Sequence, residues 1–71
     1  MAEQIYAEMV ANVFAVTVAE GEQVRAGATL LVLESMKMEI PVLCETGGTV
    51  TEVKVRPGDV VQEGDVLVVV T

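Results

Sequence analysis

Apolar and polar residues alternate along short stretches of the chain. Two such stretches are 13–18 and 50–55, and a period of two residues predicts a β-strand with one buried face. Two apolar runs, Leu30–Glu34 and Val66–Val70, predict further strands. No segment keeps the three- and four-residue apolar spacing of an amphipathic helix over a useful length. We therefore expect an all-β fold of seven or eight short strands.

The strand pattern occurs twice. When the chain is shifted by 37 positions, nine residues of the first half meet identical residues of the second half. The pairs are Glu8/Glu45, Val13/Val50, Val16/Val53, Val18/Val55, Gly21/Gly58, Val24/Val61, Gly27/Gly64, Leu30/Leu67 and Val32/Val69. Most are glycines or branched apolar residues, which are typical of turns and strands. We expect a flattened β-barrel or sandwich whose two halves are related by a pseudo-twofold axis.

The segment between the two units is not explained by the repeat. Leu30–Leu33 enters it as a strand and Ile40–Leu43 leaves it as one, which predicts a hairpin with Met36 and Lys37 near its tip. Neither residue favours a tight turn, for which Asn-Gly or Asp-Gly is the usual pair. Their presence indicates that function selected the side chains. Pro41 lacks a main-chain donor, so its strand is expected at a sheet edge or with Pro41 at a non-bonded position.

Composition disfavours several kinds of site. The net charge of −7 opposes binding to nucleic acid, and only Tyr6 and Phe14 could stack on bases. The chain has no histidine and one cysteine, so no zinc, iron–sulfur or haem site is expected. Cys44 is expected to be a small core residue beside Leu43.

Length and terminal sequence bear on organisation and location. The 71 residues allow one domain, residues 1–71, with a modest core. The N-terminus lacks a basic region followed by an apolar stretch, and the longest apolar run, Val66–Val70, is too short to span a membrane. Together with the lone thiol, these features favour a cytoplasmic protein that does not bind membranes. A monomer is expected.

Lys37 is one of two lysines and is expected at an accessible position. An unperturbed lysine amine is protonated at neutral pH and is a weak nucleophile, and Glu34 and Glu39 would favour its charged form. Lys37 is therefore better suited to be the substrate of another enzyme than to be a catalytic residue. The other lysine, Lys54, alternates with Val53 and Val55 and is expected on a solvated face.

The Glu-Ser-Met-Lys-Met-Glu sequence of residues 34–39 resembles the attachment motif of the biotinyl domains of biotin-dependent carboxylases. Those domains carry Met-Lys-Met at a hairpin tip, preceded by Ala or Ser. The repeated unit, the Gly-Asp turns and the central motif extend the resemblance over the whole chain, which is most similar to small free-standing biotin carrier proteins. The halves align without a gap from Glu8 to Glu34, so the thumb of larger bacterial carriers is expected to be absent.

The resemblance implies a function for Lys37. This residue matches the lysine to which biotin–protein ligase attaches biotin through an amide. The cofactor would then be carboxylated in a biotin carboxylase and would deliver the carboxyl group in a carboxyltransferase, as part of an acyl-CoA carboxylase. The chain would be a carrier and not an enzyme. Met36, Met38, Glu34 and Glu39 match the flanks of the motif and are expected to be read by partner enzymes.

Three other functions remain open. A lipoyl carrier domain of a 2-oxo acid dehydrogenase would share the fold, although such domains usually present Asp-Lys-Ala. An unmodified interaction module would use the hairpin only for docking. A small enzyme using Lys37 or Cys44 is disfavoured because no paired acid, histidine or phosphate-binding loop accompanies them. If no partner reads these flanks, Met36 and Met38 are expected to be half-buried turn residues on the barrel rim, and Glu34 and Glu39 to be solvated charges.

Overall fold

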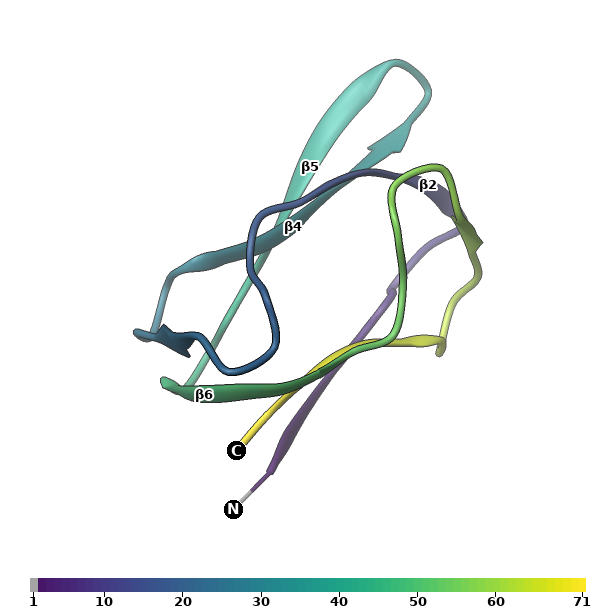
Figure 1. The fold of residues 1–71 in the computed structure, drawn as a ribbon. Coiled ribbons are helices and arrows are strands. Elements are labelled where there is room, and N and C mark those ends of the chain that lie inside the picture. The colour runs from purple at the N-terminus through teal and green to yellow at the C-terminus, as the bar shows by residue number, and fades with distance from the viewer. Residues whose placement is uncertain (1) are drawn as a thin grey trace.

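The computed structural model describes residues 2–71 and contains eight β-strands in two facing sheets (Figure 1). The strands are β1 Glu3–Tyr6, β2 Ala11–Val16, β3 Gln23–Val24, β4 Thr29–Ser35, β5 Met38–Leu43, β6 Gly48–Val53, β7 Val60–Val61 and β8 Val66–Val70. One antiparallel sheet has the order β1-β8-β6-β3 and the other β5-β4-β2-β7. The predicted all-β flattened fold is confirmed. Within residues 2–71 there is no helix long and apolar enough to cross a membrane.

The repeat seen in the sequence is also a repeat of hydrogen bonds. A shift of 37 residues carries β2 onto β6 and β3 onto β7. The amide of Gly21 donates to the carbonyl of Val50 at 2.7 Å, and the amide of Gly58 donates to the carbonyl of Val13 at 2.9 Å. Each half therefore donates an equivalent hydrogen bond to the other half, as the pseudo-twofold axis predicts.

The two long strands end earlier than predicted. The alternating pattern suggested strands as far as Val18 and Val55, but β2 ends at Val16 and β6 ends at Val53. After these points the chain crosses from one sheet to the other, since β2 and β3 belong to different sheets. Val55 is still buried and Val18 still packs on the core, so the alternation reports burial beyond the ladder itself.

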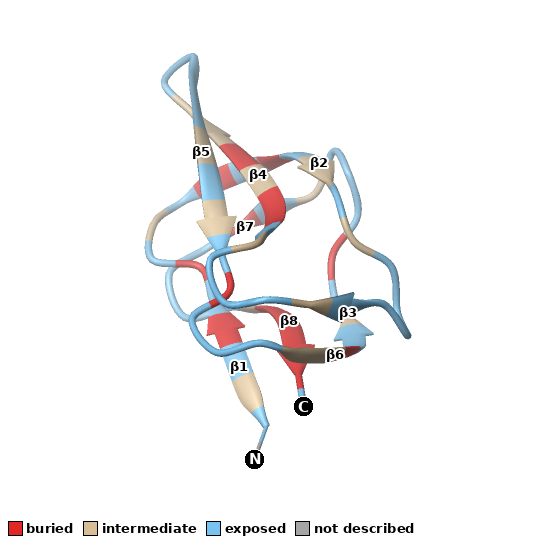
Figure 2. Cartoon of the chain, turned by 90° about the vertical axis from the view of Figure 1, so that its left-hand side faces the viewer, coloured by how far each residue is buried: buried red, intermediate tan, exposed pale blue. Residues whose placement is uncertain are grey.

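The core lies between the two sheets and draws equally on both units (Figure 2). Leu30 and Leu67, which are 37 positions apart, are both completely buried. Cys44 is 1% exposed, which confirms its predicted place in the core. Burying such side chains is the main source of stability in a domain without a disulfide.

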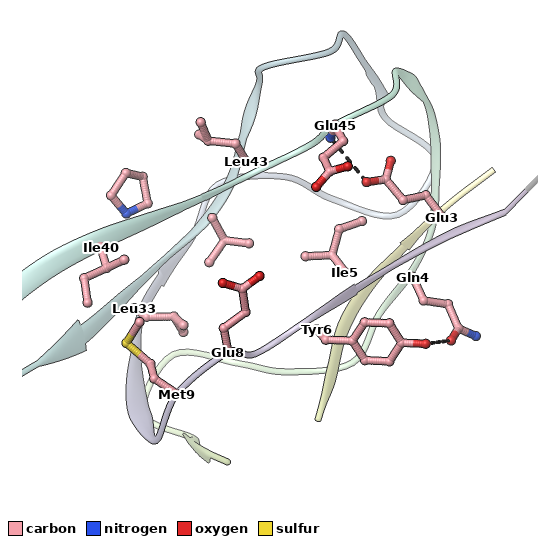
Figure 3. Close-up of a pocket in the computed structure, with 12 residues that line it drawn as sticks. Glu3, Gln4, Ile5, Tyr6, Glu8, Met9, Leu33, Ile40, Leu43 and Glu45 are labelled. Atoms are coloured by element: carbon pink, nitrogen blue, oxygen red, sulfur yellow. Dashed lines mark hydrogen bonds between the residues drawn. The ribbon is translucent and has the colours of Figure 1, made fainter. Parts of the chain in front are cut away.

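The two sheets do not close into a continuous barrel. The outer strands β1 and β5 are sheet edges, and a groove of about 270 Å³ lies between them (Figure 3). Its apolar lining includes Ile5, Leu33 and Ile40, and Glu8 and Glu45 also line it. The molecule is therefore a sandwich that is open between β1 and β5.

Pro41 lies in the edge strand β5, as predicted. Ser35 and Met38 are the last pair of the ladder before the turn, which is where a two-residue turn places its hydrogen bond. Because bonded and non-bonded pairs alternate in an antiparallel ladder, the pair of Val32 and Pro41 is non-bonded. The nitrogen of Pro41 therefore faces away from β4, toward the open edge.

Candidate functional site

Met36 and Lys37 alone connect β4 to β5. Ser35 lies opposite Met38, which leaves these two residues as the whole loop. Their φ angles are 52° and 65°, and they are the only non-glycine residues among 2–71 with positive φ. Positive φ at both central positions defines a type I′ turn, whose handedness matches the twist of the strands. The predicted hairpin tip is confirmed, and its backbone is one that neither side chain favours.

The side chains of residues 36–38, at the hairpin tip, are all exposed to solvent. Met36 is 89% exposed and Met38 is 60% exposed, and Lys37 is also exposed. The hairpin projects beyond the sandwich, at the end opposite the two termini (Figure 1). The methionines therefore do not pack on the barrel rim. They present polarizable, adaptable side chains beside the lysine.

Glu34 and Glu39 lie directly opposite each other at the base of the tip. Glu34 is partly buried and Glu39 is exposed. Neither carboxylate takes part in a hydrogen bond or an ion pair recorded between residues 2–71, and like charges in this position destabilise a hairpin. The site thus places two unneutralised negative charges beside Lys37.

Lys37 presents an exposed primary amine at a tight turn. The ion pair found within the described part of the chain joins Lys54 to Glu52, so the amine of Lys37 is not held by a carboxylate. Lys54 instead lies on the solvated face of its strand region, as predicted. No group of three or more potential metal ligands is found in residues 2–71.

A second polar cluster was not predicted from the sequence. The carboxylate of Glu3 accepts hydrogen bonds from the hydroxyl of Thr46 at 2.7 Å, the amide of Thr46 at 3.1 Å and the amide of Glu45 at 3.3 Å. The Thr46 hydroxyl is the main reason that the pKa of Glu3 lies below its ordinary value of 4.5. Burial raises the pKa of the Cys44 thiol, and the nearby Glu3 charge raises it further. This cluster joins β1 to the loop after β5, far along the hairpin from Lys37.

The sequence is similar to a known protein family and to a described protein. The profile of the family Biotin_lipoyl, described as "Biotin-requiring enzyme", matches residues 2–70. The Biotinylated protein TB7.3 homolog of Mycobacterium leprae is 52% identical over 71 residues, which is 100% of both chains.

Solved structures agree with this match. A single-chain, multi-domain long-chain acyl-CoA carboxylase superposes with a TM-score of 0.91 and 37% identity, over 99% of this chain and 7% of that one. The lipoyl domain of the Azotobacter vinelandii 2-oxoglutarate dehydrogenase complex superposes with a TM-score of 0.78 over 94% and 95% of the two chains, and at 24% identity it shows the fold alone. The chain is thus similar to biotinylated carrier domains, and it belongs to the Biotin_lipoyl family.

Proposed function

We propose that Lys37 carries biotin through an amide on Nζ, and that the chain is a carrier and not itself an enzyme. Biotin–protein ligase adds the cofactor, and a biotin carboxylase and a carboxyltransferase of an acyl-CoA carboxylase use it. The observation that carries the proposal is the exposed lysine in a two-residue turn whose backbone disfavours both of its residues. A turn needed only for folding would hold Asn-Gly.

The attachment reaction needs little from the chain beyond position. The neutral amine of Lys37 attacks the carboxyl carbon of adenylated biotin, and an amide bond forms. The bond from that carbon to the AMP oxygen breaks, AMP leaves, and the nitrogen releases one proton to solvent. The turn directs the lysine away from the sandwich, while the flanking ladder from Ser35/Met38 to Leu33/Ile40 holds the turn in place. Such a substrate lysine requires no basic or acidic partner from its own chain, and none is paired with it here.

Biotin, when attached, supplies a ureido nitrogen that carries a carboxyl group between two active sites. Lys37 supplies the tether. Eleven single bonds separate its Cα from the ring system of a biotinyl group, a reach of roughly 12 Å in extended-chain geometry. Tethering raises the local concentration of the cofactor at both active sites without tight docking at either.

The partnership with an acyl-CoA carboxylase is supported by the likeness to the long-chain acyl-CoA carboxylase, of which this chain corresponds to 7%. The net charge of −7 favours encounters with basic protein surfaces over nucleic acid. We further propose that the protein acts in the cytoplasm, as a single domain and as a monomer. A carrier that visits two active sites needs free access to its tip.

Mass spectrometry of the chain from its own cells tests the proposal. We expect a biotinyl adduct on Lys37 in both the intact mass and the peptide that contains this residue. A lipoyl adduct would assign the chain to 2-oxo acid dehydrogenases instead. An unmodified chain, even after incubation with biotin ligase, ATP and biotin, would contradict the proposal and favour an interaction module.

A further inference from the structure

The outer faces of the two sheets differ at pseudo-equivalent positions. Phe14 in β2 and Val60 in β7 are 51% and 66% exposed on the sheet that carries the hairpin, and Val10, which directly precedes β2, is 64% exposed. The residues 37 positions away are Thr51 in β6 and Gln23 in β3 of the other sheet, and Gly47, which directly precedes β6. The same β unit thus has polar residues at Thr51 and Gln23 in one copy and exposed apolar residues at Phe14 and Val60 in the other. Gly47 differs from Val10 for a steric reason, since a Cβ at Gly47 would lie 2.8 Å from the carbonyl oxygen of Val24. We call Val10, Phe14 and Val60 the apolar patch.

The fold does not require the apolar residue at position 14. Phe14 is the extra residue of a β-bulge in β2, and Thr51 is the extra residue of the equivalent bulge in β6. The hydroxyl of Thr51 donates to the carbonyl of Val69 at 3.2 Å and is within 3.1 Å of the hydroxyl of Thr71. Phe14 has no such role and projects a half-exposed ring into water. Exposed apolar patches of this kind mark interaction surfaces.

The apolar patch lies in register with the base of the hairpin. Val60 is opposite Asn12, Asn12 is opposite Glu34, and Glu34 is opposite Glu39. This row crosses the whole sheet from β7 to β5, and with strands about 4.8 Å apart it spans roughly 14 Å. The upper sheet in Figure 2 contains these four strands together with the hairpin. An approaching protein therefore meets apolar side chains, then two unneutralised carboxylates, then Lys37.

We propose that the apolar patch is a docking surface for the biotin–protein ligase, which covers it with an apolar surface bordered by lysine or arginine side chains. This inference rests on the proposed function. The two opposed carboxylates of Glu34 and Glu39 call for a cationic border. The ligase is the partner because it must bring its activated acyl group to Nζ of Lys37, only five bonds from the main chain. Enzymes that act on the biotin ring reach it through eleven bonds and can leave the sheet uncovered.

The test compares the wild-type chain with the double variant Phe14→Thr/Val60→Gln, which carries the residues of the other sheet. Initial rates of biotinylation are measured against carrier concentration with saturating biotin and ATP. We expect KM for the variant carrier to rise about ten-fold, as for the loss of an apolar interface anchor, with kcat nearly unchanged. The turn that presents Lys37 is untouched, so the variant still biotinylates to completion.

Tyr6→Thr is the matched control, because Tyr6 is 49% exposed and lies on β1 of the other sheet. Its KM is expected to stay at the wild-type value, and thermal unfolding verifies that all variants fold. Equal KM values for the double variant and the control would overturn the docking surface. The proposal would also be overturned if the ligase modified the double variant normally and the biotinylated variant bound poorly only to a biotin carboxylase. Failure of the wild-type chain to be biotinylated would instead contradict the proposed function.

Discussion

The pairing of β4 with β5 and the pairing of β8 with β1 are pseudo-equivalent, but their ends differ. Leu33 lies opposite Ile40 in the first pair, and Val70 lies opposite Glu3 in the second, with each residue displaced by 37 positions. Past Leu33 and Ile40 the strands continue into the hairpin of residues 34–39. No turn joins β8 to β1, which lie at the two ends of the sequence.

This difference separates what folding needs from what function needs. The open end forms the same strand pair without a turn, and the Glu3 carboxylate of β1 there binds Thr46 and Glu45 in the loop after β5. The six residues of the hairpin end therefore extend beyond what the core requires. Their unfavourable turn and opposed charges cost stability, which is typical of residues selected for a partner or a reaction.

The largest effect is expected at the hairpin end from Lys37→Arg. Arginine keeps the positive charge but has no neutral amine to attack the activated biotin, so biotin incorporation falls to zero. Intact-mass spectrometry after co-expression with biotin ligase measures this. Lys54→Arg is the control and retains one adduct per chain. An adduct that persists in Lys37→Arg would move the attachment site away from the tip.

Replacing the tip by Met36→Asn/Lys37→Gly is expected to stabilise the fold. Both new residues tolerate positive φ, so the free energy of unfolding rises by about 1–2 kcal/mol. Urea denaturation measures the change, and the variant accepts no biotin.

Met38→Asn is the control for this gain. Met38 belongs to β5 and is not among the residues with positive φ, so asparagine brings no benefit there. A tip variant that is no more stable than Met38→Asn would show that the turn stores no strain. It would contradict the claim that the hairpin end, unlike the open end, costs stability.

At the open end, Glu3→Gln is expected to lower the free energy of unfolding at neutral pH by about 0.5–1 kcal/mol. Glutamine keeps one oxygen acceptor but loses the charge that strengthens the bonds to Thr46 and Glu45. Glu8→Gln is the control, since Glu8 is exposed and is in no recorded hydrogen bond. Equal effects of both substitutions would show that only net charge matters.

The same bonds make stability depend on pH in a defined direction. The pKa of Glu3 is lowered in the folded chain, so its contribution is complete above the unfolded pKa and is lost as the pH falls through the folded pKa. Denaturation curves of the wild type and Glu3→Gln are expected to differ at pH 7 and to converge in acid below the ordinary value of 4.5. If the stabilities of the two chains differed by the same amount at every pH, the contribution of the Glu3 charge to stability would be contradicted.

The smallest expected effect concerns Cys44, whose thiol lies 3.9 Å from the Glu3 carboxylate. Because burial raises the pKa of this thiol and limits access, iodoacetamide should label it slowly in the native chain. Glu3→Gln loosens the open end and is expected to increase the labelling rate a few-fold, whereas the Asn-Gly tip leaves it unchanged. Faster labelling in the tip variant would show that the two ends are coupled.

Local patterns were sufficient to predict β2, β4, β5, β6, β8 and the hairpin tip, because alternation and apolar flanks depend on neighbouring residues. No residues were assigned to β1, β3 or β7, and the last two strands have only two residues each. The strand ends at Val16 and Val53 were not predictable, since they depend on where the chain crosses between sheets. The bond between Glu3 and Thr46 joins residues 43 positions apart and follows no sequence pattern. The exposure of Phe14 was predictable from the sequence. Alternation from the buried Val13 places Phe14 on the outer face, where the equivalent residue of the repeat is the polar Thr51.

Pro41 has a consequence for how these molecules behave when many are present. An edge strand with a free row of donors is a template on which a second molecule can add its own strand and start a fibre. The missing donor of Pro41 interrupts that row on β5, on the same hairpin that enters other proteins under the proposed function. The chain can therefore be exposed and apolar near its working end and still resist self-assembly through that edge.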